Sequence, residues 1–189
     1  MRIALLFNFI LVFTSCHLNG QENHRKDVAN LINSIDSLTN TLDTPANKLV
    51  AYFKKITVIA KNKKNYQLED NQVDSLKYYY EALNFNYENA IRIATSFKKN
   101  DGTDSFKNNF ITLLKKGKEP WEITIPKYLK LYKDGLDSMS ESEQNIISTT
   151  ASIYKNSALD ALQLSDIVEK QKDSLVKKYH LAMYNNRYR

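Results

Sequence analysis

The sequence is poor in the residues that make disulfides, tight turns and catalytic centres. Its 189 residues include one cysteine, three prolines, four glycines and three histidines. A single cysteine excludes a disulfide framework and any cysteine-based zinc or iron–sulfur cluster formed within one chain. So few glycines and prolines disfavour an all-β sandwich, which needs many tight turns. The length favours one domain, because two smaller cores would each bury too little surface.

The motifs of common catalytic and cofactor-binding classes are missing as well. The sequence has no Glu-x-x-His pair for a di-iron site and no Cys-x-x-Cys-His for haem attachment. It also lacks a Gly-x-Ser-x-Gly elbow and a phosphate-binding glycine loop. His17 and His24 fall in a polar segment where solvated side chains are expected, and His180 lies beside an apolar face. We therefore predict that the protein is not an enzyme, with no catalytic, cofactor-binding or metal-binding residues.

The charge is moderately basic, with 27 Lys+Arg against 21 Asp+Glu and a net charge of +6. Lysine dominates this excess, whereas arginine, the residue that reads and stacks on bases, is scarce. The lysine pairs are dispersed along the chain, which is typical of solvated helix faces. We predict no nucleic-acid partner, and any attraction to anionic lipid or glycan is secondary.

The first residues, MRIALLFNFILVFTSC, are typical of a secretion signal. The apolar run from Ile3 to Phe13 is about eleven residues, or about 17 Å as a helix. Because the hydrocarbon core of a bilayer is about 30 Å thick, this run is too short to span it. The pattern predicts an exported protein.

The one cysteine lies directly after this apolar run. Phe13-Thr14-Ser15-Cys16 resembles the bacterial lipobox, although Phe13 stands where leucine is usual. The resemblance implies a lipoprotein signal peptide over residues 1–15 and lipidation of Cys16, which would tether the protein to the membrane. The alternative is ordinary secretion with cleavage after a small residue such as Gly20, in which case Cys16 is discarded. In the bacterial lipoproteins that this segment resembles, an aspartate directly after the cysteine favours retention in the inner membrane. His17 stands at that position here, so the resemblance implies the outer membrane or cell surface.

Residues 17–27 are polar and lack apolar periodicity, so we predict a lipidated tether over residues 16–27 and a helical domain over residues 28–189. Within that domain, apolar residues recur at intervals of three and four in four stretches. These stretches cover about 28–60, 71–99, 103–139 and 140–182. The pattern predicts an all-α fold, an antiparallel four-helix bundle with long helices.

We expect two of the helical regions to be interrupted. Pro45 is well placed as the first residue of a helix capped by Thr44, which predicts a kink or break in the first region. The third region contains Gly117 and two prolines, and WEITI between the prolines alternates apolar and polar residues. We interpret the segment from Gly117 to Pro126 as an ordered loop or a loose helical turn.

The whole mature chain resembles a group of uncharacterised bacterial surface lipoproteins, found in Bacteroidota and leptospires. The resemblance lies in the lipobox, the helix lengths, a Tyr-Leu-Lys-Leu-Tyr core between Leu113 and Leu136, and the lysine-rich end from Glu169 to Tyr179. It implies an envelope location and a small helical bundle, and it implies no chemistry.

Tyrosine is the one residue in excess of structural need, with twelve in the chain. Tyr78, Tyr79 and Phe85 fall off the apolar seam of their helix, so they form either a wide core face or a surface for a protein partner. We predict a lipid-anchored extracytoplasmic envelope protein with a non-catalytic protein-binding or structural role. The alternative is a small-ligand carrier or sensor with a cavity between helices, lined by Trp121, and an unrecognised enzyme comes third.

Overall fold

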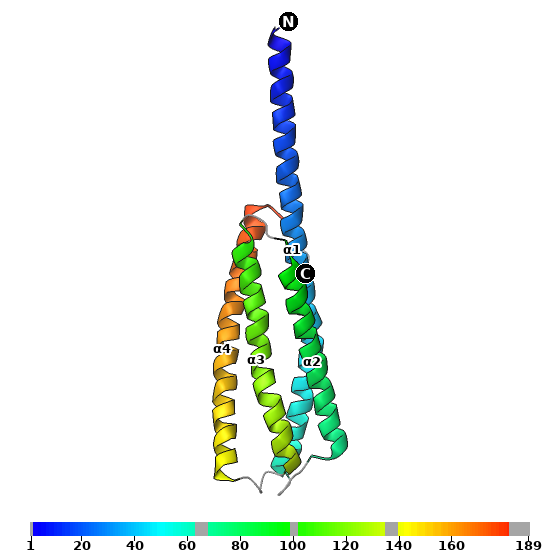
Figure 1. Cartoon of the computed structure of the whole chain (residues 1–189), viewed down its shortest axis with the longest axis vertical. Helices are drawn as coiled ribbons and strands as arrows, with labels where there is room; N and C mark the ends of the chain where they lie inside the picture. The colour runs from blue at the N-terminus through cyan, green and yellow to red at the C-terminus, as the bar shows by residue number, and fades with distance from the viewer. Residues whose placement is uncertain (1, 63–67, 99–101, 135–139, 182–189) are drawn as a thin grey trace.

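The computed structural model describes residues 2–62, 68–98, 102–134 and 140–181, which form four helices and no strand. The helices are α1 (Arg2–Asn62), α2 (Asp70–Ser96), α3 (Asp104–Asp134) and α4 (Glu141–Lys178). Consecutive helices pack side by side with alternating direction, and α1 and α4 have the least contact among the neighbouring pairs. The predicted antiparallel four-helix bundle is confirmed, with α1 projecting beyond one end of it (Figure 1).

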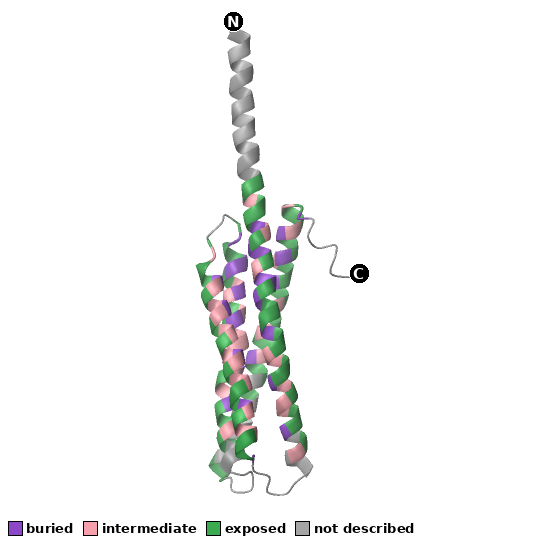
Figure 2. Ribbon diagram, turned by 90° about the vertical axis from the view of Figure 1, so that its right-hand side faces the viewer, coloured by how far each residue is buried: buried purple, intermediate pink, exposed green. Residues whose placement is uncertain are grey.

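The seam predicted for the second helix is confirmed by burial. Leu76, Leu83, Ala90 and Ala94 are the buried residues of α2, spaced by seven, seven and four. Such spacing keeps one stripe of a helix facing its neighbours. The same division between buried inner faces and exposed outer faces runs along the other helices (Figure 2).

The buried side chains form two clusters that follow each other along the bundle. The first cluster lies toward the end from which α1 projects, and all four helices contribute to it. Its members include Val28 of α1, Ala90 of α2, Phe106 of α3 and Leu175 of α4. The second draws its described members from α1, α2, α3 and the connection before α2. Tyr87 packs against both clusters, so it marks the level where they meet.

The break predicted at Pro45 does not occur, because α1 is a single helix that contains this proline. A proline inside a helix costs about 3 kcal/mol, since it removes one hydrogen bond and crowds the preceding turn. Leu42 and Leu49 flank it on one face and are both buried. Burying each is worth about 1.5–3 kcal/mol, which is enough to offset the defect.

The interruption predicted from Gly117 to Pro126 is also wrong, because α3 continues through Gly117, Pro120 and Pro126. Trp121 packs against the second cluster and Ile125 is buried in it, one helical turn further on. Their spacing of four suits a helix, so tertiary packing overrides the local tendency of glycine and proline to end one.

Gly117 has a packing role instead of ending the helix. A Cβ atom at this position would lie 2.9 Å from the Tyr87 hydroxyl oxygen. The missing side chain therefore lets the tyrosine of α2 approach the backbone of α3, which explains a glycine in the middle of a helix.

The segment predicted as a tether without apolar periodicity, residues 16–27, is part of the helix α1. His24, expected to be solvated, shares a 3.0 Å hydrogen bond between its Nε2 atom and the Tyr179 hydroxyl. Arg25 donates a 2.8 Å hydrogen bond to the backbone carbonyl oxygen of His180. Contacts between the predicted tether and the bundle therefore begin before residue 28.

The end of α4 has the hydrogen bonds of a Schellman motif. The Leu181 amide donates to the Val176 carbonyl and the His180 amide donates to the Lys177 carbonyl. His180 has a φ of 48°, the left-handed conformation that glycine usually provides at this position. Leu181 is buried, so the motif returns the chain to the core.

Candidate functional site

Two aromatic side chains on α2 point away from the core. Tyr78 and Phe85 are each 68% exposed. They are seven residues apart, which places them on the same side of the helix, two turns from each other. This outer face of α2 is the part of the predicted partner surface that the structure leaves accessible.

Tyr79, the third residue of that predicted surface, has a different environment. Its side chain is partly buried and packs against the second cluster. Its ring centroid lies 5.3 Å from that of Tyr52 on α1 and 5.7 Å from that of Tyr78. Tyr79 therefore joins α2 to α1, and Tyr78 rests against its edge.

An apolar cavity opens between the helices near the level where the two clusters meet. Its volume is about 430 Å³, and it is partly enclosed. All four helices contribute to its wall, which comprises Thr39, Leu42, Asp43, Ala46, Tyr87, Phe110, Leu113, Leu114, Gly117, Pro120, Trp121, Ala158, Ala161 and Leu162. Small-molecule sites usually have volumes of about 300–1,000 Å³, so this cavity is large enough for one.

Small side chains on facing helices create this space. Ala46 on α1 lies across from Ala158 and Ala161 on α4, and Gly117 on α3 contributes no side chain at all. The helices α1 and α4 also have little contact with each other, which leaves room for the cavity between them. A large side chain on either helix would fill this room.

Thr39 and Asp43 on α1, Tyr87 on α2 and Trp121 on α3 are the lining residues with polar side-chain groups. Thr39 donates its hydroxyl to the Ile35 carbonyl oxygen of its own helix at 3.0 Å. Asp43 supplies the only carboxylate among the described lining residues, and none of these residues is lysine, arginine or histidine. Among the described lining residues, the one charged side chain is therefore that of Asp43, which is negative.

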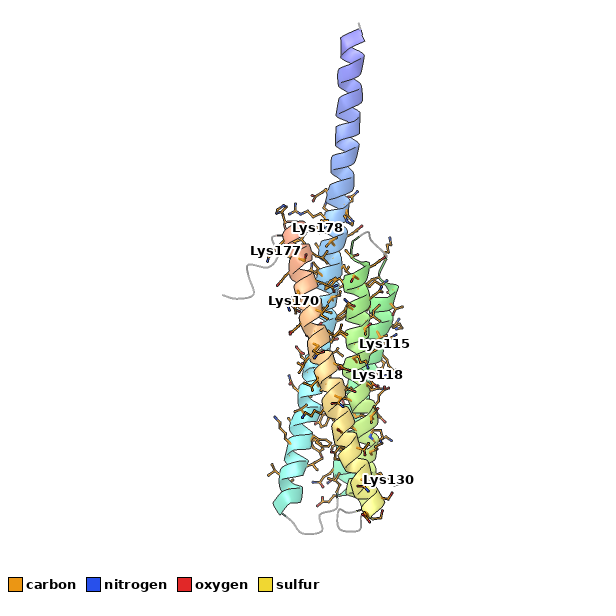
Figure 3. The ribbon with its side chains drawn as sticks, turned by 90° about the vertical axis from the view of Figure 1, so that its left-hand side faces the viewer. Lys115, Lys118, Lys130, Lys170, Lys177 and Lys178 are labelled. Atoms are coloured by element: carbon orange, nitrogen blue, oxygen red, sulfur yellow. The ribbon has the colours of Figure 1, made fainter. Side chains whose placement is uncertain are left out.

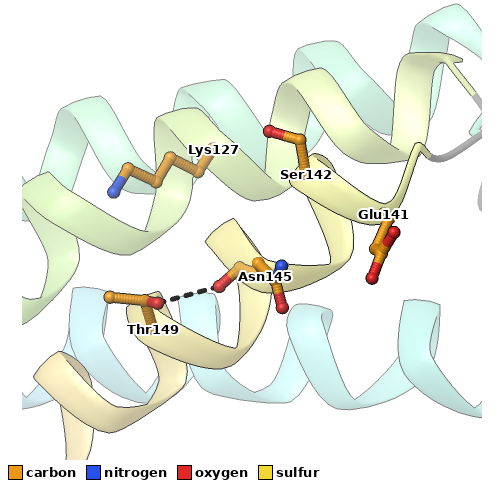
Figure 4. Close-up of a pocket in the computed structure, with 5 residues that line it drawn as sticks. All are labelled: Lys127, Glu141, Ser142, Asn145 and Thr149. Carbon is orange, nitrogen blue, oxygen red and sulfur yellow. Dashed lines mark hydrogen bonds between the residues drawn. The ribbon is translucent and has the colours of Figure 1, made fainter.

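A second, polar hollow lies between α3 and the beginning of α4 (Figure 4). Lys127, Glu141, Ser142, Asn145 and Thr149 line it, and its volume is about 510 Å³. It is shallow and open to solvent. Thr149 donates its hydroxyl to the Asn145 carbonyl within α4, an ordinary contact inside a helix.

One ion pair joins α2 to α3 beside the second cluster, and a second one within α3 shares its lysine. Lys118 pairs with Glu88 at 3.0 Å and with Glu122 at 2.8 Å. Burial alone would lower the pKa of Lys118, but its hydrogen bonds to Glu122 and Glu88 outweigh this effect and raise it. Burial raises the pKa of Tyr80, and the carboxylate of Glu122 adds to the rise. These shifts have a structural explanation and indicate no reactive group.

One ion pair is buried and joins α1 to α4. The Lys172 ammonium lies 3.3 Å from the Asp36 carboxylate, and these side chains are only 8% and 11% exposed. The exposed Glu169 carboxylate approaches the same ammonium at 2.6 Å. This pair lies within the first cluster, where α1 and α4 are held together.

The lysines are spread over the outside of the bundle, as expected from their spacing. Lys130 lies near one end of α3, Lys115 and Lys118 lie further along it, and Lys177 and Lys178 lie at the far end of α4 (Figure 3). This distribution forms no single basic patch on the view drawn.

Cys16, the predicted lipidation site, falls within α1, but its side chain lies outside the part of the chain that is described. None of the helices as described is both long and apolar enough to cross a membrane. Within the described ranges, no group of three or more His, Cys, Asp or Glu side chains could hold a metal ion.

Comparisons of the chain with protein-family models, with curated proteins and with solved structures find no match. The resemblance to bacterial helical lipoproteins therefore stays a prediction.

The sequence indicated Trp121 as the lining of a cavity between helices, and the structure places it there. Ala158 and Ala161 of α4, which line the same cavity, were not predicted. The signal that could have marked them is their small size on the apolar face of a long helix.

Proposed function

We propose that this protein is a lipid-anchored, extracytoplasmic protein of the cell envelope with a non-catalytic binding role. The observation that carries the anchor is the position of its only cysteine, Cys16, immediately after an apolar run too short to span a bilayer. We also propose that the protein is related to bacterial surface lipoproteins and that it lies in the outer membrane or at the cell surface.

The course of α1 is compatible with such an anchor. Val28 is the first buried residue along the described part of the helix. Cys16 precedes it by twelve residues, or about 18 Å of helix. A lipid attached at Cys16 would therefore lie clear of the packed core, and the bundle would remain folded beside the membrane.

The proposed contact surface for a protein partner is the outer face of α2 with Tyr78 and Phe85. Both rings are largely exposed, and exposed aromatic residues of this kind are enriched in protein interfaces. Removing them from water on binding would gain free energy without disturbing the core, because neither ring belongs to either cluster.

Lipidation is tested with radiolabelled palmitate in cells that express the wild-type chain or Cys16→Ser. We expect label only in the wild type, with a mature N-terminus at Cys16. Equal labelling of both chains, or an N-terminus at Gln21 as ordinary secretion predicts, would refute the anchor.

The partner surface is tested with a photo-crosslinking amino acid at position 78, with position 170 on α4 as an exposed control. We expect a discrete protein adduct from position 78 that is lost when Phe85→Ser is added. Identical adducts from both positions would refute this surface and leave the anchor unaffected.

A further inference from the structure

We infer that the apolar cavity between the helices is a binding site for a small, uncharged, hydrocarbon-rich molecule, in the chemical class of a fatty alcohol. This inference goes beyond the proposed anchor and does not depend on it. It rests on the size of the cavity, the chemistry of its wall and an exposed leucine at its edge.

The wall provides a large apolar surface with a few polar groups at one side. Phe110, Trp121 and Tyr87 supply aromatic faces, and leucines of α1 and α3 complete the apolar lining. Ligand sites in proteins typically combine such a lining with a small number of polar groups that set orientation. Thr39 and Asp43 are the α1 residues that could accept a hydrogen bond from a hydroxyl group of the ligand.

Leu162 supports an occupant of the cavity. Its side chain lines the cavity and is nevertheless 65% exposed. Leu159, one turn earlier on α4, is 48% exposed. A hydrocarbon chain in the cavity would cover apolar surface of Leu162 that the helices themselves leave in contact with water.

The charge of the wall selects against an anionic ligand. Asp43 carries the carboxylate of the site, and no basic side chain is found among the described lining residues. Asp43 is exposed and water screens its charge, but a fatty acid carboxylate would still meet a like charge with no basic side chain among the described lining residues. An uncharged hydroxyl group meets no such penalty and can donate to the same carboxylate.

The proposed lipid on Cys16 of the same molecule cannot reach this cavity. Leu42 lies 26 residues after Cys16 along α1, or about 39 Å. One leaflet of a bilayer has a hydrocarbon depth of about 15 Å, which is the reach of an acyl chain. The ligand must therefore be a separate molecule.

The chain provides its own reporter, because Trp121 is its only tryptophan and lines the cavity. We suggest titrating the full chain carrying Cys16→Ser, which has no lipid attached, with 12-bromododecanol in the absence of detergent. Bromine quenches tryptophan fluorescence on contact, so saturable quenching reports occupancy next to Trp121. The matched anionic probe is 12-bromododecanoate.

Ala161→Leu fills the cavity, and Ala51→Leu adds the same atoms on an exposed face of α1 as the control. We expect the alcohol to quench Trp121 saturably in the starting chain. Ala161→Leu should bind the alcohol at least tenfold more weakly, and Ala51→Leu should bind it as tightly as the starting chain. Ala158→Leu serves as a second filling variant if the first loses its helical circular dichroism.

The charge assignment has its own outcome in the same experiment. The bromododecanoate should bind more weakly than the alcohol, and Asp43→Asn should narrow this difference. Absence of saturable quenching in the wild-type chain, or quenching unchanged by both filling variants, would overturn the site. Equal binding of acid and alcohol would overturn the proposed ligand class.

Discussion

The buried ion pair between Lys172 and Asp36 makes a quantitative prediction. It joins α1 and α4, the two neighbouring helices with the least mutual contact. Lys172→Met keeps much of the side-chain volume and removes the ammonium group. The Asp36 carboxylate then stays buried without the Lys172 ammonium.

The magnitude follows from the burial of the pair. Removing one partner of a buried ion pair typically costs about 3–5 kcal/mol, because the remaining charge is left in an apolar environment. Asp36 keeps 11% of its side-chain exposure, so we take the lower end, about 3 kcal/mol. For a chain of this size, each kcal/mol shifts Tm by about 2–4 °C, which gives a fall of about 6–12 °C.

The assay is thermal unfolding followed by circular dichroism, supported by urea titration. Lys170→Met, an exposed position two residues away, is the matched control and should stay within about 0.5 kcal/mol of wild type. The double variant Asp36→Leu/Lys172→Met should recover most of the loss, because it leaves no buried charge behind. A loss below about 1 kcal/mol in Lys172→Met, or a double variant as unstable as the single one, would refute this reasoning.

Three further predictions concern local packing, each measured by Tm and urea titration. Gly117→Ala should destabilise the chain by about 1 kcal/mol, because crowding against the Tyr87 hydroxyl outweighs the gain in helix propensity. Gly117→Ala should cost less in a Tyr87→Phe background than in the wild type, and a stabilised Gly117→Ala single variant would contradict the close contact. His180→Gly should stabilise the chain by about 0.5–1 kcal/mol, because glycine adopts the left-handed conformation without strain; a fall in Tm would show that the side chain matters more than its φ. Tyr79→Ser should cost about 1–2 kcal/mol and Tyr78→Ser less than about 0.5, since only the first ring packs on the core. Equal losses in these two variants would contradict their different burial.

Periodicity was enough to predict the bundle because burial on a helix repeats with the helix itself. The buried positions of α2, from Leu76 to Ala94, are members of the seam expected from spacing alone. The continuity of α1 and α3 could not be predicted this way. Whether a helix survives Pro45 or Gly117 depends on partners distant in sequence, such as Tyr87 against Gly117.

The candidate sites were predictable to different degrees for the same reason. The aromatic residues Tyr78, Tyr79 and Phe85 indicated a surface on α2. The ring contact of Tyr79 with Tyr52 on α1 shows that Tyr79, unlike Tyr78, packs between helices, and the sequence alone could not predict this contact. The cavity depends on alanines from α1 and α4 meeting in space, more than 100 residues apart in the chain. No local pattern carries that information.

The unbroken course of α1 has a mechanical consequence. A helix without a break transmits bending and torque, so the direction of its exposed end sets the direction of the whole bundle. From Cys16 to Asn62 it extends over 46 residues, about 69 Å. A lipid on Cys16 would thus hold the far end of the bundle at a distance of more than twice the hydrocarbon thickness of a bilayer, about 30 Å. The protein would act as a stiff spacer whose reach is set by the length of one helix.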